Sequence, residues 1–418
     1  MSFVIVSLIL YIFEGFYITQ TVYRSSTAIY ITFCGLFAIV VLAALGVVKQ
    51  PIPYNKSLII WLPYLAYTAF GYFSQGKLEY FVYWSICAII IFFSIALRIH
   101  RFVPIKLFYG LSIFSVIGIL VQLLLPDFYY SNISPLFVTS SQIKAWGVNY
   151  GMAGFFYQLD SAAMPILFGE CVYLAFGRNS IEESNIKLKD IIVVGGSIIF
   201  VLLTGKRMLF LISVMIPFVI GFFTGKNQKK RFGIILISIL VVAFSYNLII
   251  NNLQYLYNNP HLNRIAVTFM KISAGEDISS GRNSLSQMAL EIYQNNKLFG
   301  VGVSNFQKVS GAYTDVHNTY LQTLCEQGIV GFLLFTIPLL VNFIYTVKKS
   351  REEDYSKTAS FLKLSIAVQA VYIIYAFTGN VNINQTGYMM YFILVSMMHS
   401  AVYWKAEEVK NEEVFDFN

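Results

Sequence analysis

Long apolar runs constrain the fold of this chain more than any other feature. Hydrocarbon offers no hydrogen-bond partners to a bare backbone, so apolar runs of roughly 20 residues must form helices. The composition agrees, because 57% of the 418 residues are hydrophobic, 12% are charged and the mean hydropathy is +0.65. That is too little charge to cover a soluble globule of this size. The sequence therefore predicts an all-α polytopic membrane protein, with a single membrane domain over residues 1–418.

About twelve transmembrane helices are expected. Apolar windows between charged residues or Pro and Gly breaks place them near 2–20, 27–48, 57–73, 78–97, 105–125, 155–176, 191–203, 208–223, 233–251, 328–346, 361–377 and 387–403. The first run lacks a basic leader and a small-residue cleavage site, so we expect a retained helix rather than a removed signal peptide.

The basic residues orient these helices. With both termini in the cytoplasm, most of the 29 Lys and Arg residues fall inside, including the "KNQKKR" run and the "KKSREEDYSK" loop. The net charge of +8 is therefore a signal of membrane topology, and nucleic acid is not an expected partner. The cysteines have no metal-ligand spacing and are expected as buried, unpaired thiols, namely Cys34, Cys87, Cys171 and Cys325.

Two outside loops are longer than the rest. The first, 126–150, contains Tyr129, Tyr130 and Trp146, which are suited to stacking on sugar rings. Aromatic residues also collect at the membrane interface, and this second interpretation is the one that the position favours. The second, 252–327, is a large extracytoplasmic loop inserted between transmembrane helices, and loops of this length are usually functional or disordered.

The large loop has the pattern of folded structure. Apolar residues recur at helical spacing in "HLNRIAVTFMKI" and in "NSLSQMALEIY", which predicts two short helices. Asn283 or Ser284 is a plausible N-cap for the second helix, and Arg282 then lies just ahead of it. Free N–H groups at a helix start attract anions, and a guanidinium strengthens this preference, so a phosphate is a suitable ligand here.

Further along the loop, Gly300 and Gly302 allow a tight turn or a close backbone approach. The following "NTYLQTLCEQG" has the spacing of a short helix that leads into the span starting near Gly328. His317 lies at the beginning of this helix, two residues after Asp315. Taken alone, such a histidine is most simply an exposed loop residue.

Charged residues also interrupt the apolar spans. Lys206 and Arg207 occupy a very short outside turn in "LLTGKRMLF". Such cations often extend to lipid head groups, but these two lie on the side that the positive-inside rule disfavours. Asp160 and Glu170 fall in a predicted span, roughly 80° apart on a helix, and are expected to face the helical bundle.

The motifs "TGKR" at a turn between helices, "SGRN" in the large loop, the Gly-x-Gly turn and "HNTYLQTLCEQGIVG" together resemble the O-antigen ligase and polymerase family of bacterial surface-polysaccharide assembly. The resemblance is strongest over roughly 191–346. Members of this family typically have a serine at the position of Lys206, whereas Arg207 matches.

The resemblance implies a metal-independent membrane glycosyltransferase of the C type that needs no cofactor. Its donor is a glycan carried on polyprenyl diphosphate, and its acceptor is a sugar hydroxyl at the outer face of the bacterial cytoplasmic membrane. The functional arginines and histidine of the family correspond to Arg207, Arg282 and His317. Residues expected to line the substrate site are Lys206, Asp315, Asn318, Tyr320 and Trp146.

Elementary chemistry points to the same roles. A lipid diphosphate is already a good leaving group, so the enzyme must mainly hold the charge that grows as the glycosidic bond breaks. Two permanently cationic arginines can do so through bidentate hydrogen bonds. Histidine is the natural base for a sugar hydroxyl near neutral pH, and Asp315 is a candidate for its orienting partner.

Other functions remain open at this level. A polymerase joins one lipid-linked repeat unit to another, as in capsule synthesis, whereas a ligase transfers the finished glycan to a different acceptor. We favour the polymerase, with membrane lipids as surroundings and with a flippase and a chain-length regulator as partners in the pathway. A lipid-linked oligosaccharide transporter is a third possibility, but internal repeats and polar groups near the bilayer centre would then be expected.

Overall fold

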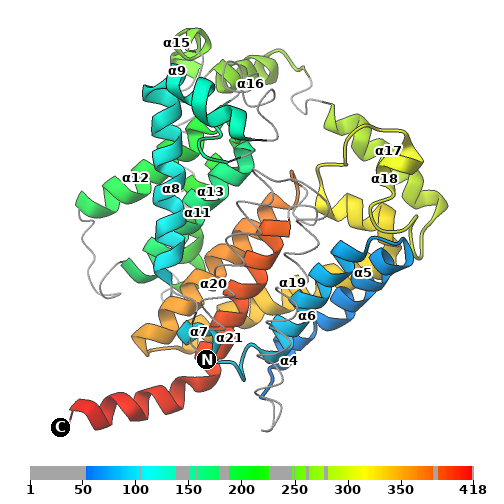
Figure 1. The fold of residues 1–418 in the computed structure, drawn as a ribbon. Helices are drawn as coiled ribbons and strands as arrows, with labels where there is room; N and C mark the ends of the chain where they lie inside the picture. The colour runs from blue at the N-terminus through cyan, green and yellow to red at the C-terminus, as the bar shows by residue number, and fades with distance from the viewer. Residues whose placement is uncertain are drawn as a thin grey trace. The chain divides into compact units, whose positions relative to one another are not determined.

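The structure is a computed structural model that describes residues 53–102, 105–137, 151–156, 158–177, 188–225, 233, 247–248, 250–259, 263–276, 281–379 and 385–416. Throughout these ranges the regular elements are helices and no strand occurs, which confirms the all-α class for the described residues. The chain divides into two compact units, one made of 1–16, 25–104 and 284–418, and the other of 17–24 and 105–283. Figure 1 shows the helices of each unit with their labels.

Four described helical segments are long and apolar enough to cross a membrane, namely Leu159–Gly177, Arg207–Thr224, Thr319–Glu352 and Ser356–Tyr375. A fifth candidate is the pair Phe108–Leu124 and Pro126–Leu136, which is bent by 108°. The protein is therefore a multi-pass membrane protein. The expected spans at 2–20 and 27–48, and nearly all of that at 233–251, lie outside the described residues. The count of twelve and the location of the termini stay predictions.

The first unit contains α4 (Lys56–Ile59), α5 (Leu62–Ser74), α6 (Leu78–Phe93), α7 (Ile99–Phe102), α18 (Phe306–Ser310), α19 (Thr319–Glu352), α20 (Ser356–Tyr375) and α21 (Gln385–Asp416), and also most of α17 (Arg282–Asn295). An aromatic cluster joins three of these helices. The ring of Trp61, just before α5, meets the rings of Phe335 on α19 and Phe392 on α21 edge to face, with centroid distances of 6.2 and 5.1 Å. Large buried rings of this kind supply much of the packing energy of a core.

The second unit contains α8 (Ile105–Leu124), α9 (Pro126–Phe128), α11 (Leu159–Val172), α12 (Leu188–Leu203), α13 (Arg207–Thr224), α15 (Leu253–Asn258) and α16 (Asn263–Ser273). Two short irregular helices follow α9 (Tyr129–Ile133 and Ser134–Leu136), and a third continues α11 (Tyr173–Gly177). A Cβ at Gly169 of α11 would lie 2.5 Å from the side chain of Ser112 on α8. The missing side chain therefore lets these two helices approach closely.

The large loop is folded where the structure describes it. The two helices expected in it are confirmed as α16 and α17. However, α17 begins at Arg282 itself, so the expectation that Asn283 or Ser284 caps the helix is wrong. Gly281 has a φ of 84°, a conformation that suits glycine and turns the chain into the helix.

The structure also tests the expectations for the cysteines and for Tyr129. Cys87, Cys171 and Cys325 are buried and unpaired, as expected, while Cys34 lies outside the described residues. The interfacial interpretation of Tyr129 is wrong, because its ring is fully buried and its hydroxyl donates to the carbonyl of Gly154 at 2.5 Å.

Candidate active site

The turn at Thr204–Lys206 ends one helix and begins another, as the sequence predicts. The backbone N–H of Gly205 donates to the carbonyl of Leu202, and its φ of 70° reverses the chain before α13 begins at Arg207. The segment around Gly151 packs directly on this turn, where a Cβ at Gly151 would lie 2.2 Å from the carbonyl oxygen of Thr204. Only glycine fits so close to another backbone, so the turn that presents Arg207 is tightly fixed.

Arg207 is the centre of a group of cations in the second unit. Its Nη1 donates to Thr268 Oγ1 on α16 at 2.5 Å, and its guanidinium is close enough to Arg282 for the two charges to repel each other. Lys206 Nζ lies 3.8 Å from the carboxylate of Asp160, at the start of α11. Within the described ranges, no carboxylate forms an ion pair with Arg207. The arrangement therefore suits a ligand with more than one negative charge.

A second group of predicted site residues belongs to the first unit and begins at His317. This residue has a φ of 54°, which is uncommon for a residue with a side chain, and its Nε2 lies 3.2 Å from Thr314 Oγ1. The next residue, Asn318, is the N-cap of α19, because its side chain accepts the N–H of Leu321 at 3.1 Å. The ring of His317 is thus held at the N-terminal end of a helix, as the sequence predicts.

The residues after Asn318 attach this helix start to α20. The N–H of Thr319 donates to the carbonyl of Ala376, and its hydroxyl donates to that of Gly379, both at 2.8 Å. The hydroxyl of Tyr320 donates to the carbonyl of Ile373 at 3.0 Å. Asn318 and Tyr320 therefore have structural contacts of their own, and their expected roles in substrate binding stay predictions.

Asp315 faces several polar partners. Gln322 Nε2 lies 3.4 Å from its Oδ1, and the charges of His317 and Lys77 act on it. Burial raises the pKa of Asp315 above its ordinary value, while hydrogen bonds from Gln307 and Gln322 and the nearby positive charges oppose this rise. The expected role of Asp315 as the partner of His317 stays a prediction.

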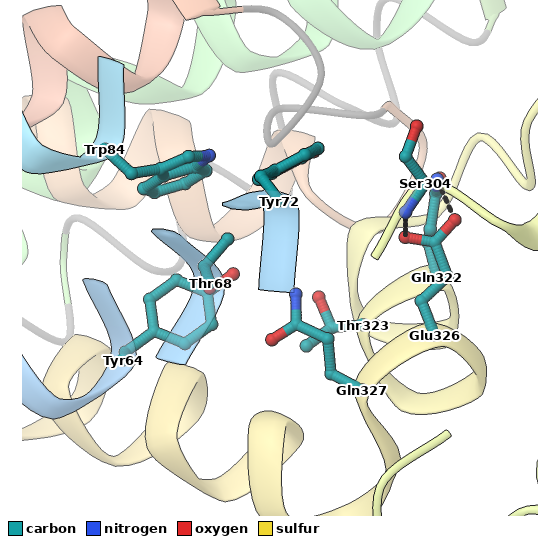
Figure 2. A pocket seen from close by; sticks show the side chains of 9 residues that line it. All are labelled: Tyr64, Thr68, Tyr72, Trp84, Ser304, Gln322, Thr323, Glu326 and Gln327. Atoms are coloured by element: carbon teal, nitrogen blue, oxygen red, sulfur yellow. Dashed lines mark hydrogen bonds between the residues drawn. The ribbon is translucent and has the colours of Figure 1, made fainter. Parts of the chain in front are cut away.

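Glu326, which the sequence offers as an alternative base should His317 not serve, is buried in the structure. It accepts hydrogen bonds from the backbone N–H of Ser304 at 2.8 Å and from Gln322 Nε2 at 3.1 Å (Figure 2). The backbone N–H of Phe306 also donates to it, at 3.1 Å. Gln322 therefore connects Glu326 to Asp315. The three residues form a chain of side chains that runs from the core of the unit to the segment that carries His317.

The glycine turn lies against this part of α19. The N–H of Gly302 donates to the carbonyl of Glu326 at 2.7 Å, and a Cβ at Gly300 would lie 2.3 Å from the carbonyl carbon of Glu326. Gly328 interrupts the helix with a φ of 66°, and the next N–H, of Ile329, donates to the carbonyl of Lys297. Gly300 and Gly302 also have φ values of 66° and 92° within a turn, so both functions that the sequence suggested for them, a tight turn and a close backbone approach, are confirmed.

The structure brings some of the predicted site residues together and leaves others untested. Arg207, Lys206 and Arg282 are in the second unit, and Asp315 and His317 are in the first. Convergence of both arginines with His317 in one cavity stays a prediction, and Trp146 lies outside the described residues. In the predicted span, Glu170 is fully buried and accepts a hydrogen bond from Ser213 on α13, so it faces the bundle as expected.

Comparison with known proteins bears on the same part of the chain. Residues 192–336 match the family model described as O-antigen ligase, and this segment contains Arg207, Arg282 and His317. A search of curated proteins found no match to the chain. The match indicates a function of the O-antigen ligase or polymerase type and does not distinguish between the two. Over residues 192–336 the chain is therefore similar to the O-antigen ligase family, in agreement with the resemblance of its sequence motifs.

Proposed function

We propose that this protein polymerises lipid-linked polysaccharide repeat units at the outer face of the cytoplasmic membrane. The donor glycan is carried on polyprenyl diphosphate, and the acceptor is a sugar hydroxyl of a second glycan. The observation that carries the proposal is the placement of Arg207 and Arg282 within range of mutual repulsion, in the segment that matches the family. Holding two like charges together costs free energy, and a bound diphosphate removes that cost.

The reaction needs one bond to form and one to break. The acceptor hydroxyl oxygen attacks the anomeric carbon of the donor, and the bond from that carbon to the diphosphate oxygen breaks with both electrons leaving on the diphosphate. The guanidinium groups of Arg207 and Arg282 stabilise the charge that grows there. His317 takes the proton from the acceptor hydroxyl, and Asp315 stabilises the positive charge that His317 then carries.

Lys206 and Asp160 have a secondary role in this mechanism. Their side chains lie 3.8 Å apart, so the carboxylate partly offsets the charge of the lysine next to Arg207. Lys206 therefore adds a weaker, adjustable contact to the diphosphate, while the two arginines supply the fixed bidentate contacts. This difference agrees with the family's serine at the position of Lys206.

Purified full-length protein should be incubated with polyprenyl-diphosphate-linked repeat units in liposomes, and the products separated on a gel. A ladder of longer glycans formed without nucleotide is the expected result. Transfer only to an unrelated acceptor lipid would identify a ligase. Movement of the donor across the bilayer with no new glycosidic bond would identify a transporter and overturn the proposal.

A further inference from the structure

The part of α19 that follows the break at Gly328 has the dimensions of a membrane span. Its mostly apolar stretch runs from Ile329 to Val347 and is followed by Lys348 and Lys349. At about 1.5 Å per residue this stretch is about 28 Å long, which matches the roughly 30 Å of hydrocarbon in a bilayer. Ile329 therefore lies at the edge of the hydrocarbon, on the side of the large loop.

One face of this span is apolar and exposed. Four large apolar residues on it are between 45% and 64% exposed and recur at spacings of three and four, namely Leu333, Ile337, Leu340 and Ile344. This spacing places them in a stripe along one side of a helix. An apolar stripe that is exposed along a membrane span suits contact with lipid chains, which are as apolar as leucine.

Part of the large loop is attached to the span at the level of Ile329. The break at Gly328 leaves the first N–H groups of the span without partners inside the helix. The N–H of Ile329 donates to the carbonyl of Lys297 at 2.8 Å. The N–H of Val330 donates to the carbonyl of Leu298 at 3.2 Å. The backbone of the loop thus lies against the first turn of the span, which fixes its depth in the membrane.

Leu298 and the next residue, Phe299, have exposed side chains at this depth. They are 63% and 62% exposed, and adjacent large apolar residues on a folded loop often mark an interaction surface. Val330, which is bonded to Leu298, precedes Leu333 of the exposed stripe by one helical turn. Lys297 is exposed beside the apolar pair and can extend its ammonium group to lipid head groups. A cation next to exposed apolar residues is typical of a segment that lies in the membrane interface.

We infer that Leu298 and Phe299 insert into the membrane and anchor the large loop in the leaflet on its side. Lipid is the partner of this surface, because the surface continues the apolar stripe of α19 at the edge of the hydrocarbon. The anchor also fixes the depth of the glycine turn, since the N–H of Gly302 donates to the carbonyl of Glu326 at 2.7 Å. All these residues belong to the first unit. The inference is independent of the proposed function and applies equally to a polymerase, a ligase or a transporter.

The test introduces a tryptophan at one exposed position at a time, in the full-length protein reconstituted in liposomes. Phe299→Trp reports on the anchor, and Leu340→Trp reports on the exposed stripe inside the span. Tyr313→Trp is the matched control, because Tyr313 is 96% exposed and lies in the same loop two residues before Asp315. The signal is the fluorescence that each variant adds to that of the wild type. The quenchers are phosphatidylcholine brominated near the head group, phosphatidylcholine brominated near the chain ends, and iodide in the water on both sides of the bilayer.

Phe299→Trp should lose most fluorescence to bromine near the head group and little to iodide, and its emission should lie at a shorter wavelength than that of Tyr313→Trp. Leu340→Trp should respond most to bromine near the chain ends, and Tyr313→Trp should respond most to iodide. If Phe299→Trp does not fold, Leu298→Trp is measured in the same way.

Two results would overturn the inference. Quenching of Phe299→Trp by iodide as strong as that of Tyr313→Trp would show that the segment lies in water. Resistance of Phe299→Trp to all three quenchers would show that protein, and not lipid, covers the surface.

Discussion

Replacing Glu326 by glutamine should loosen the segment that carries His317. The carboxylate accepts the N–H of Ser304 on one oxygen, and it accepts the N–H of Phe306 and Gln322 Nε2 on the other. A glutamine offers one oxygen and one NH₂ group, so at least one of these donors must face another donor. The change is nearly isosteric, and its effect is therefore a matter of hydrogen bonding.

The magnitude follows from the burial of this site. Glu326 is 5% exposed, so water cannot readily replace the lost acceptor. Leaving one buried donor unsatisfied costs about 1–3 kcal/mol. The free energy of unfolding should fall by this amount. Turnover should fall as well, because Gln322 also holds Asp315.

The assay is thermal unfolding of the purified protein in detergent, followed by intrinsic fluorescence, together with glycan polymerisation at a fixed temperature. Glu291→Gln is the matched control, because this substitution makes the same chemical change at an exposed position on α17. We expect the Glu326→Gln midpoint to drop by a few degrees while that of Glu291→Gln stays near the wild type. Equal midpoints and equal turnover in all three proteins would refute the view that Glu326 anchors the turn at Ser304.

Four further predictions concern the chemistry. His317→Ala should stay folded and lower turnover by roughly 10² to 10⁴, with a much smaller change in donor binding; near-normal turnover would show that the base is elsewhere. Arg282→Ala should weaken donor binding and turnover, and Arg282→Lys should restore only part of each, because an ammonium lacks the planar fork; full recovery with lysine would argue against bidentate contact. EDTA should leave activity unchanged because the arginines hold the diphosphate charge, and a loss restored by Mg²⁺ would contradict this assignment. Asp315→Asn should be more stable than the wild type by a margin that grows between acidic and neutral pH, as measured by melting at each pH; a margin independent of pH would contradict the raised pKa.

The sign of the last effect follows from the direction of the pKa shift. The pKa of Asp315 is higher in the folded protein than its ordinary value. The folded state therefore binds the proton more tightly than the unfolded state, and stability falls as the pH rises through that interval. Above the folded pKa the unfavourable contribution is complete, and asparagine removes it. Below both pKa values the two proteins should differ little.

Local patterns in the sequence predicted much of the fold around the candidate site. Helical spacing of apolar residues predicted α16 and α17, and the charged break between two apolar runs predicted the turn before Arg207. These features succeed because they depend on neighbours within one or two helical turns. Helix α17 begins at Arg282, earlier than predicted, because a residue that suits the N-cap position does not always occupy it.

Contacts between distant residues were beyond the reach of such patterns. Glu326 accepts hydrogen bonds from the backbone of Ser304 and Phe306, which lie about 20 residues earlier in the sequence. No periodic pattern in the sequence predicts that pairing. Tyr129 was expected at the membrane interface because buried and interfacial aromatic residues look alike in a sequence, and only its bond to Gly154 shows which one it is. Contacts between α5 and α19 are unpredictable for the same reason, because the two helices are far apart along the chain.

The conformation of His317 gives a separate reason to assign it a function. Its neighbours have clear structural contacts, since Asn318 caps α19 and Thr319 bonds to α20. His317 itself adopts a left-handed backbone conformation, which costs of order 1 kcal/mol for a residue with a side chain. Glycine would adopt the same φ with little strain. The anchors on its C-terminal side hold this strained backbone in place, and Thr314 Oγ1, 3.2 Å from Nε2, helps to orient the imidazole. A protein gains from such an arrangement when that direction matters for chemistry, and this is the requirement that a general base must meet.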